Sequence, residues 1–343
     1  TVLRSISRLA PGNEKILEIK DLHTAFRFED EYFDAVDGVS FSLHKNELLA
    51  IVGESGCGKS TIANSIVGLH DKNFTRVSGE IIYNGENMVN YSEEQLNEIR
   101  GKEIGFIFQD PLASLNPLHR IGKQIEESLI YHTDLNSDQR YERMLQLLDQ
   151  VGIVNPKRTA NQFPHQLSGG MRQRVLIAIA LSCNPNIIIA DEPTTALDVT
   201  IQAQILDILM ELKNKINAGI ILITHDLGVV AQMADRVAVM YAGQIVEIAE
   251  ANELFSNPLH PYTRSLLQSI PQSDSDDEEL HVIHGMVPSL KNLPRQGCRF
   301  SSRIPWIAAS EHEDNPELHE VLKNHFVRCT CWKNYHFENE GGY

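Results

Sequence analysis

The feature of this sequence that most constrains its fold is a glycine-rich loop between a buried apolar segment and a helical one. Leu48–Val52 is a continuous apolar run, Gly53–Ser60 spells GESGCGKS, and Thr61–Leu69 has helical spacing of its apolar residues. The loop fits the GxxxxGK[ST] pattern of phosphate-binding loops and occupies the strand-to-helix position that phosphate binding requires. The alternative is a glycine-rich turn with a chance lysine, which the flanking strand and helix disfavour.

This loop predicts a set of contacts to a nucleoside triphosphate. Its glycines let successive backbone N–H groups point at phosphate oxygens, and the helix N-terminus adds the positive end of its dipole. We expect Lys59 to reach the β- and γ-phosphates, Ser60 to bind Mg²⁺ and Thr61 to contact the α-phosphate. The nucleotide-binding residues predicted here are Gly53, Ser55, Gly56, Cys57, Gly58, Lys59, Ser60 and Thr61. Cys57 is expected to be a small filler and not a nucleophile, because its neighbours must bind phosphate.

A second apolar segment ends in two carboxylates. Ile187–Ala190 is followed by Asp191 and Glu192. Asp191 is placed to hold Mg²⁺ through its water ligands, since Mg²⁺ loses water reluctantly. Glu192 is the candidate general base that polarises the attacking water. Asp-Glu after a strand is otherwise a common helix-capping device, but together with the phosphate loop it predicts nucleotide hydrolysis.

Strands and helices alternate along the chain, which predicts an α/β fold with a parallel sheet covered by helices on both faces. We expect Asp37-Gly38 to be a turn and Asn84-Gly85 to be a hairpin turn. The expected strands are Leu17–Ile19, Val39–Leu43, Leu48–Val52, Gly79–Tyr83, Ile104–Phe108, Ile187–Ala190, Ile220–Thr224 and Val237–Tyr241. The expected helices are Thr61–Leu69, Ile121–Tyr131, Gln139–Val151, Gly169–Ser182 and Ile201–Lys215.

Composition excludes several classes of partner and location. The net charge of −16 and the isoelectric point near 5.3 disfavour electrostatic association with nucleic acid or anionic lipid. No apolar run approaches the roughly 20 residues of a membrane-spanning helix, and Thr1–Lys20 has no apolar core of signal-peptide length. These features predict a cytosolic chain. Its five cysteines, an odd number, argue against a disulfide framework.

Further motifs separate this chain from other phosphate-loop proteins. Leu167–Met171 (LSGGM) resembles the signature of ATP-binding-cassette (ABC) proteins, with Met171 in place of the commoner glutamine. In isolation, Ser168 there would be a simple helix N-cap. Thr224-His225-Asp226 resembles the switch histidine of that family, and Phe108-Gln109-Asp110-Pro111 resembles its Q-loop. With the two motifs above, all five ABC motifs follow in sequence order.

The ABC resemblance implies a fold and a shared active site. The fold is a P-loop NTPase with a RecA-like core, an antiparallel β subdomain and a helical subdomain. ATP bound to one subunit would be capped by Ser168, Gly169 and Gly170 of another. The catalytic residues would be Glu192, His225 and Gln109, with His225 at the γ-phosphate. Mg²⁺ would be held by Ser60, Gln109 and Asp191, and Asp198 would lie at the dimer contact.

Four segments resemble the oligopeptide/dipeptide importer ATPases: Pro111–Pro117, Gly169–Arg174, Asn257–Thr263 and Gly297–Phe300. Importers of nickel, glutathione and some sugars use close relatives, so the solute is open at this point. The resemblance implies a paralogous ATPase subunit as heterodimer partner, two membrane permeases and an extracellular solute-binding protein. The chain would lie at the cytoplasmic face of the cell membrane as a peripheral subunit that powers the import of peptides. It would have no nucleic-acid partner.

Two rival classes are weighed against this interpretation. Soluble, non-transport ABC ATPases usually carry two cassettes or long coiled-coil inserts, and this chain has neither. A regulatory module with a dead ATPase is opposed by the presence of Lys59, Asp191, Glu192 and His225.

The domain prediction places the ABC nucleotide-binding domain at residues 14–255, with a helical subdomain at about 110–180, and a C-terminal accessory domain at 256–343. Some relatives bind a four-iron–four-sulfur cluster through four cysteines in the C-terminal domain. Here Ile304 and Glu311 occupy two of those positions, so an iron–sulfur cluster is not expected. Cys331 is an additional cysteine, and three cysteines with His312 or His325 would make a zinc site. The sequence favours a metal-free domain.

The adenine ring of ATP usually stacks on an aromatic residue upstream of the phosphate loop. Phe26 fits the subfamily spacing best, and Phe28, Tyr32 and Phe33 lie near the same place. Each of these rings would otherwise be a core or loop residue.

Overall fold

The computed structural model describes residues 11–269 and 286–338. The acidic run Ser273–Glu279, which we expect to be a solvated linker, and Ile270-Pro271, which we expect to interrupt a short helical stretch, lie outside the described residues. The chain forms two compact units, each of which gathers separate stretches of sequence. The first contains residues up to 18, 42–48 and 82–223, and the second contains residues 19–41, 49–81 and those from 224 onward.

The first unit combines three parallel strands, β6 (Ile104–Ile107), β7 (Ile187–Asp191) and β8 (Gly219–Ile223), and the short strand β5 (Glu86–Asn87) with a set of helices. Its helices are α2 (Glu93–Ile99), α3 (Pro111–Ser114), α4 (Ile121–His132), α5 (Ser137–Gln150), α6 (Pro156–Ala160), α7 (Gly169–Leu181) and α8 (Val199–Ile216), with 3₁₀ turns η1 (Met88–Asn90) and η2 (Pro164–Gln166).

The parallel strands of this unit are buried on both faces. β7 pairs with β6 on one side and β8 on the other, and every residue of β7 and β8 is buried. Such strands are continuous apolar runs because helices cover both faces. Helix α7 packs so closely on β6 that a side chain at Gly105 would collide with the carbonyl of Ala180.

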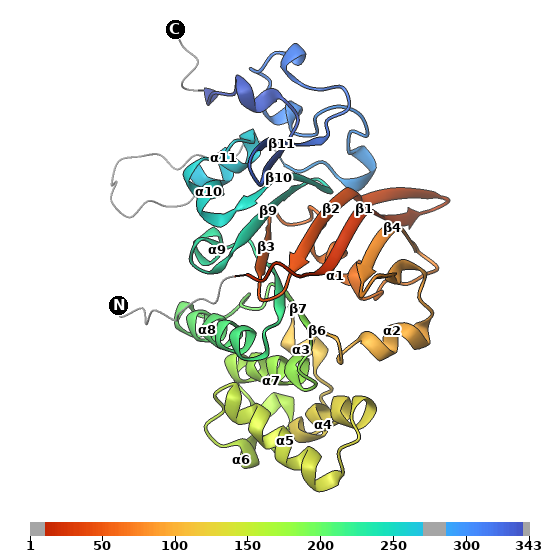
Figure 1. Cartoon of the computed structure of the whole chain (residues 1–343), viewed down its shortest axis with the longest axis vertical. Helices are drawn as coiled ribbons and strands as arrows, with labels where there is room; N and C mark the ends of the chain where they lie inside the picture. Colours follow the sequence, from red (N-terminus) through yellow and green to blue (C-terminus); the bar gives the residue numbers. More distant parts are fainter. Residues whose placement is uncertain (1–10, 270–285, 339–343) are drawn as a thin grey trace. The chain divides into compact units, whose positions relative to one another are not determined.

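Residues 111–181 contain the helices α3 to α7, which gather in one body in Figure 1. The predicted helices at Ile121–Tyr131 and Gln139–Val151 are confirmed to within about two residues at each end. Asn136 and Gln139 form a capping box that fixes the start of α5. The short apolar faces of these helices pack on each other and on α7, so the insert has a small core of its own.

The second unit contains a mixed sheet and the C-terminal segment. Its strands are β1 (Lys15–Phe28), β2 (Glu31–His44), β3 (Leu48–Val52), β4 (Thr75–Tyr83), β9 (Arg236–Tyr241), β10 (Gln244–Glu250), β11 (Leu318–Leu322) and β12 (His325–Arg328), of which β1 to β4 have one end in the first unit. Its helices are α1 (Lys59–Ile66), α9 (Leu227–Met233), α10 (Ala251–Ser256) and α11 (Pro261–Gln268), with 3₁₀ turns η3 (Leu290–Asn292), η4 (Ser301–Arg303), η5 (Ala309–Glu311) and η6 (Cys331–Lys333).

Strands from the C-terminal segment extend a sheet of the second unit. β3 and β9 are parallel, β10 turns back antiparallel to β9, and the β11–β12 hairpin adds to the edge of β10. The pairing of β12 with β10 joins Val327 to Glu247 and Phe326 to Ile248. The segment after residue 256 is therefore hydrogen-bonded to the sheet that carries the phosphate loop, and the boundary at 255/256 remains a prediction.

One turn prediction is wrong. Asp37 and Gly38 lie inside the long strand β2, and the turn between β1 and β2 is at Glu29-Asp30, where Glu29 has a positive φ of 57°. Gly38 also has a positive φ, so it marks an irregularity within the strand and not its end. The hairpin turn at Asn84-Gly85 is confirmed, since both residues have positive φ and β4 pairs with β5 around them.

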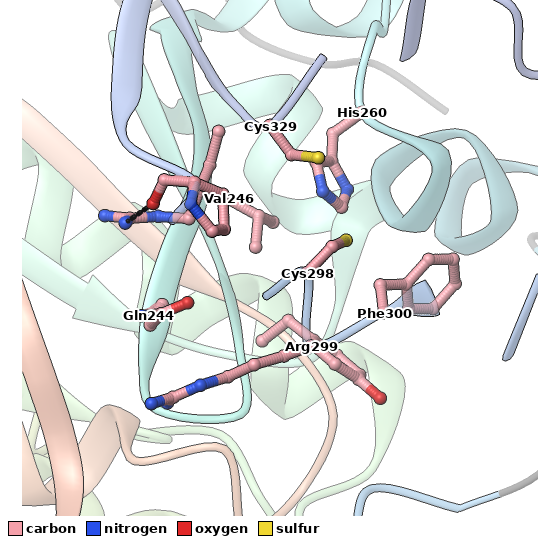
Figure 2. A pocket seen from close by; sticks show the side chains of 10 residues that line it. Gln244, Val246, His260, Cys298, Arg299, Phe300 and Cys329 are labelled. Atoms are coloured by element: carbon pink, nitrogen blue, oxygen red, sulfur yellow. Dashed lines mark hydrogen bonds between the residues drawn. The ribbon is translucent and has the colours of Figure 1, made fainter. Parts of the chain in front are cut away.

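A small pocket lies beside β10 in the second unit (Figure 2). Its wall includes the sulfur atoms of Cys298 and Cys329 together with the His260 ring. Arg299 and Arg328 also line it, so two guanidinium groups border a pocket that contains two thiols.

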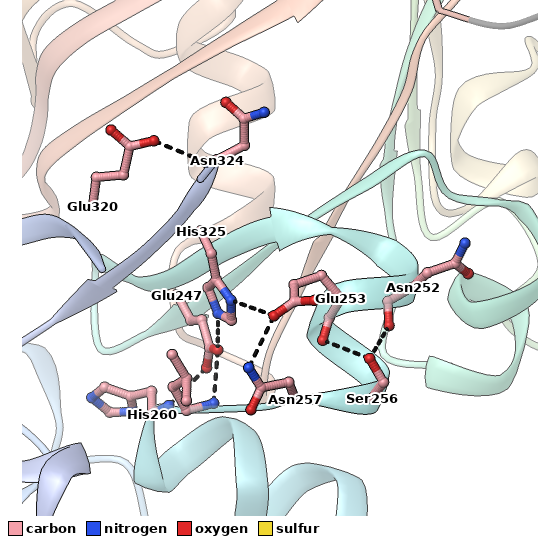
Figure 3. Close-up of polar contacts among 10 residues, drawn as sticks. Glu247, Asn252, Glu253, Ser256, Asn257, His260, Glu320, Asn324 and His325 are labelled. Carbon is pink, nitrogen blue, oxygen red and sulfur yellow. Dashed lines mark hydrogen bonds and ion pairs between the residues drawn. The ribbon is translucent and has the colours of Figure 1, made fainter. Parts of the chain in front are cut away.

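A buried polar network joins β12 to β10 and α10 (Figure 3). His325 Nε2 lies 2.7 Å from Oε1 of Glu247, and both side chains are fully buried. Glu247 also accepts the backbone N–H groups of Leu259 and His260, at 2.9 Å each. Burial alone would lower the pKa of His325, but the two glutamates beside it, Glu247 and Glu253, raise its pKa overall. The network stabilises the attachment of the C-terminal hairpin.

None of the described helices is long and apolar enough to span a membrane.

Candidate functional site: a phosphate loop and a carboxylate end

At two glycines of the phosphate loop between β3 and α1, the surrounding backbone leaves no room for a side chain. Gly58 has φ 103°, and a Cβ there would lie 2.6 Å from the carbonyl oxygen of Ala35. A Cβ at Gly53 would collide with the carbonyl of Met240. Gly56, by contrast, faces open space, and Ser55 beside it is exposed. The base of the loop is therefore packed against neighbouring strands, while its rim is free for a ligand.

Lys59 holds the loop in shape from within. Its side chain is buried, and its Nζ donates to the carbonyl oxygens of Gly53 at 2.8 Å and Glu54 at 3.0 Å. The loop therefore carries a buried positive charge, which suits an anionic phosphate. Burial raises the pKa of the nearby Cys57 thiol, although the charge of Lys59 opposes this shift. The thiol therefore stays protonated at neutral pH, as expected of a filler residue.

Two residues from beyond position 255 support the loop. The backbone N–H of Glu54 donates to the hydroxyl of Tyr262 at 2.8 Å, and Nη1 of Arg303 donates to Oε2 of Glu54 at 2.7 Å. The Arg303 side chain is almost fully buried and Tyr262 is buried as well. Sequence reasoning gave neither residue this role, because both lie more than 200 residues from Glu54, and Tyr262, within Asn257–Thr263, was used only for the family resemblance.

In the first unit, the end of β7 carries the two predicted carboxylates. Asp191 is the last residue of the strand and is buried, whereas Glu192 is half-buried and has a positive φ of 45°. Oε2 of Glu192 accepts hydrogen bonds from Nε2 of Gln109 at 3.1 Å and from the hydroxyl of Thr195 at 3.0 Å. The structure thus brings Gln109 and Glu192 together, as the prediction of a shared catalytic centre requires.

The left-handed backbone at Glu192 is costly for a residue with a side chain, by about 1–3 kcal/mol. Its N–H donates to the carbonyl of Ile223 at 2.9 Å, which holds the chain in this conformation. Gln109 is exposed just after β6, and Asp110 next to it caps α3. The carboxylate is therefore fixed by backbone and side chain together. The contact of Thr195 with Glu192 was not predicted, although Thr195 lies between Glu192 and Asp198, which were both predicted site residues.

The LSGGM segment starts α7 as predicted. The hydroxyl of Ser168 accepts the N–H of Met171 at 3.3 Å, and Ser168 and Gly169 are exposed. A Cβ at Gly170 would meet the side chain of Ile201 at 2.9 Å, so a larger residue would push α7 away from α8. Asp198 caps α8 through the N–H of Ile201 at 3.0 Å and is itself exposed.

His225 follows the end of β8 and is exposed. Asp226, the next residue, caps α9 through the N–H of Val229 at 3.1 Å. The two adjacent residues therefore have different roles: one starts a helix and the other leaves its imidazole accessible.

Comparison with known proteins identifies the family. Residues 36–195 match the family described as ABC transporter, and residues 246–306 match the family described as oligopeptide/dipeptide transporter, C-terminal region. An oligopeptide transport ATP-binding protein of Lactococcus lactis subsp. cremoris is 53% identical over 96% of this chain and 97% of its own length. One of Bacillus subtilis is 50% identical over 92% of this chain and 88% of its own.

The chain belongs to the oligopeptide/dipeptide transport ATP-binding proteins of the ABC family. Among solved structures, a dimeric ATP-binding cassette in a post-hydrolysis state, bound to ADP and Pi, is 30% identical, with a TM-score of 0.62 over 69% of this chain and 99% of the cassette. A cassette protein of Clostridium perfringens that is part of an ABC transporter complex gives 0.61 at 28% identity, over 71% of this chain and 92% of its own. ATP hydrolysis is the activity of this ABC ATPase.

The aromatic residues upstream of the phosphate loop have different surroundings in this ABC ATPase. Phe26 packs edge-on against the His70 ring with centroids 5.5 Å apart, so one edge of it is already covered. Tyr32 lies under the guanidinium of Arg76, and Phe28 packs edge-on against Phe33. Phe26 remains the predicted adenine contact.

Proposed function

We propose that this chain hydrolyses Mg²⁺-bound ATP to power the uptake of peptides through a membrane complex. The observation that carries the catalytic part is the Glu192 carboxylate, which Gln109 and Thr195 hold at the end of a buried strand. A fixed, half-buried carboxylate at this position suits a general base that orients water.

In this proposal the phosphate loop holds the triphosphate through the N–H groups of residues 53–61. Lys59 would turn from its own loop carbonyls to the β- and γ-phosphates, exchanging neutral acceptors for charged ones. Mg²⁺ would be held by Ser60, Gln109 and Asp191, whose oxygen atoms are the ligand type this ion takes. His225 would contact the γ-phosphate. Phe26 would stack on the adenine.

Each active site would be completed by a second ABC subunit. Ser168 and Gly169 are exposed at a helix start, where N–H groups attract phosphate, so they suit a γ-phosphate brought by a partner. We propose a paralogous ATPase subunit as that partner, with Asp198 at the contact. The closed dimer would then depend on the γ-phosphate and open after hydrolysis.

The peptide assignment is supported by the relatives, whose names describe oligopeptide or dipeptide transport. The closing and opening of the ATPase dimer would be passed to two membrane permeases, which this chain would bind at the cytoplasmic face of the membrane. An extracellular solute-binding protein would deliver the peptide. Nucleic acid is not a partner in this proposal, in keeping with the acidic charge.

Peptide uptake in cells that lack this chain tests the proposal. Wild-type chain should restore uptake of a labelled oligopeptide, and Lys59→Ala should not. Unchanged peptide uptake together with lost uptake of nickel, glutathione or a sugar would reject the peptide assignment while keeping the ATPase.

A mixing experiment tests the shared site. Ser168→Arg in this chain should inactivate the ATP site carried by the partner and spare its own, because the bulky cation would occupy the place of the partner's γ-phosphate. Nucleotide trapping in the mixed complex assigns the dead site. Loss at the mutated chain's own phosphate loop would contradict the shared-site arrangement.

A further inference from the structure

Four side chains with metal-binding atoms converge in the C-terminal segment. Cys298, His312, Cys329 and Cys331 each offer one atom, and these four atoms all lie within 4.8 Å of one another. The three cysteines are buried. They come from separate places: one before η4, one directly after β12, and one at the start of η6. No strand pairing or helix among the described residues by itself brings these three thiols and the imidazole together.

The residues at the positions that some relatives use for an iron–sulfur cluster do not fit such a cluster. Ile304 is a buried core residue. Glu311 faces another way, since its carboxylate accepts from Nδ2 of Asn334 at 2.5 Å and its carbonyl from the hydroxyl of Thr330 at 3.1 Å. A four-iron cluster takes four thiolates, and this cluster of side chains supplies three.

His312 supplies a second observation. Its Nδ1 atom is buried and has no hydrogen-bond partner among the residues that the structure describes. An unsatisfied buried polar atom costs about 1–3 kcal/mol, so a ring nitrogen beside three thiols is best explained by a ligand that it binds. The surroundings of Cys329 also suit a metal ligand, because its sulfur accepts the N–H of Glu313 at 3.4 Å. Such N–H···S contacts are typical outer-shell support for a metal-bound thiolate.

We propose that these four residues bind one Zn²⁺ ion as a closed Cys₃His site. Around tetrahedral Zn²⁺, with Zn–S bonds near 2.3 Å, neighbouring ligand atoms lie about 3.5–3.8 Å apart. Because no pair here is separated by more than 4.8 Å, each would close by about 1 Å at most. Hard cations such as Mg²⁺ and Ca²⁺ take oxygen ligands, which this set lacks.

The surroundings suit the charge of such a site. Three thiolates, a neutral imidazole and Zn²⁺ carry one net negative charge. Arg299 and Arg328 line the same pocket as Cys298 and Cys329 (Figure 2). Arg299 is buried and pairs with Asp37, and Arg328 is half-buried.

With all four positions filled by protein, the ion has a structural role. It would tie the segment that begins at Cys298 to the end of β12. That segment includes Arg303, which pairs with Glu54 of the phosphate loop. The zinc site therefore fixes the part of the C-terminal segment that supports the nucleotide loop.

Cobalt titration of the reduced, metal-free full chain tests the site. We expect thiolate-to-cobalt bands in the near ultraviolet and tetrahedral bands in the visible, both saturating at about one Co²⁺ per chain and disappearing when Zn²⁺ is added. Wild-type chain without thiolate-to-cobalt bands would overturn the proposal. So would purified chain that contains iron and sulfide at about four atoms each.

Variants assign the ligands. Cys331→Ser and His312→Gln should each weaken Co²⁺ binding by about 100-fold or more, while Cys183→Ser, a cysteine outside the cluster, should match wild type. Wild-type affinity in both ligand variants would overturn the proposal. Circular dichroism checks folding; if Cys331→Ser is unfolded, His312→Gln decides, since His312 is half-buried and its removal opens no core.

Discussion

The phosphate loop and the carboxylate end of β7, which we propose bind and hydrolyse ATP, are held in different ways. The loop is supported from outside: Met240 and Ala35 limit its glycines, and Tyr262 and Arg303 bind Glu54. Glu192 is held within the first unit, by Thr195 three residues later, by Gln109 after β6 and by the carbonyl of Ile223.

This difference shows which half of the site depends on the C-terminal segment. A substitution at Glu192 should lower the rate of ATP hydrolysis without lowering the stability of the fold. Removing a support of the loop should disturb nucleotide affinity, because the anchors lie in another part of the chain. The predictions below test that division.

The largest effect is expected at the base itself. Glu192→Gln keeps the shape and the hydrogen bonds from Gln109 and Thr195 but removes the proton acceptor, so ATP turnover should fall by about 10²–10⁴-fold. Nucleotide affinity should stay close to wild type. Steady-state phosphate release and a fluorescent-nucleotide titration measure the two quantities. Undiminished turnover would remove Glu192 from the mechanism.

Stability below neutral pH should depend on His260, in the C-terminal attachment. Burial lowers its pKa from 6.5 to about 4, while its Nδ1 accepts the N–H of Tyr262 at 3.1 Å. In the unfolded chain this histidine gains a proton below pH 6.5, but in the folded chain only near pH 4. The free energy of unfolding should therefore fall by roughly 3 kcal/mol as the pH drops through that window.

His260→Asn isolates this effect. Asparagine keeps a side-chain acceptor for the start of α11 and does not titrate. Urea unfolding at several pH values between 6.5 and about 4 should show a shallower decline for the variant than for wild type. Equal slopes would show that other groups control acid stability.

Lys59→Ala tests the loop directly. The substitution removes the charge that would face the β- and γ-phosphates in our proposal, so nucleotide affinity should fall by about 10- to 100-fold. Lys157→Ala, at an exposed position of the first unit, is the matched control. Calorimetric titration with a slowly hydrolysed ATP analogue gives both affinities. An unchanged value for Lys59→Ala would mean that the phosphate-loop assignment is wrong.

The smallest effect is expected at the outside support. Arg303→Met keeps an unbranched apolar stem and removes the ion pair with Glu54, which is partly exposed. Nucleotide affinity should fall by about two- to fivefold, and turnover per bound nucleotide should not change. Arg158→Met, on the exposed surface, should have no effect. A drop in turnover without a change in affinity would break the division between the two halves.

Sequence alone predicted the parts of the site that depend on local pattern. The strand at Leu48–Val52 is confirmed residue for residue, because a fully apolar run between two polar loops has one interpretation. The hydrogen bond between Gln109 and Glu192 follows from motifs that were identified separately.

The rest depends on long-range contacts, which leave no periodic signal. Asp37-Gly38 has the composition of a turn but lies within β2, which pairs with the equally long strand β1. Arg303 reaches Glu54 only after the C-terminal segment has attached to β10. The convergence of Cys331 and His312 with Cys298 likewise depends on that attachment, so sequence favoured a metal-free domain.

Peptide-stimulated ATP hydrolysis by the assembled transporter in proteoliposomes tests the central claim most directly. The rate is measured with this chain, its paralogous subunit, the permeases and the solute-binding protein, with and without peptide. The account predicts a rise in rate with peptide-loaded binding protein and no rise when this chain carries Glu192→Gln. A rate that ignores every peptide but rises with another solute would contradict it.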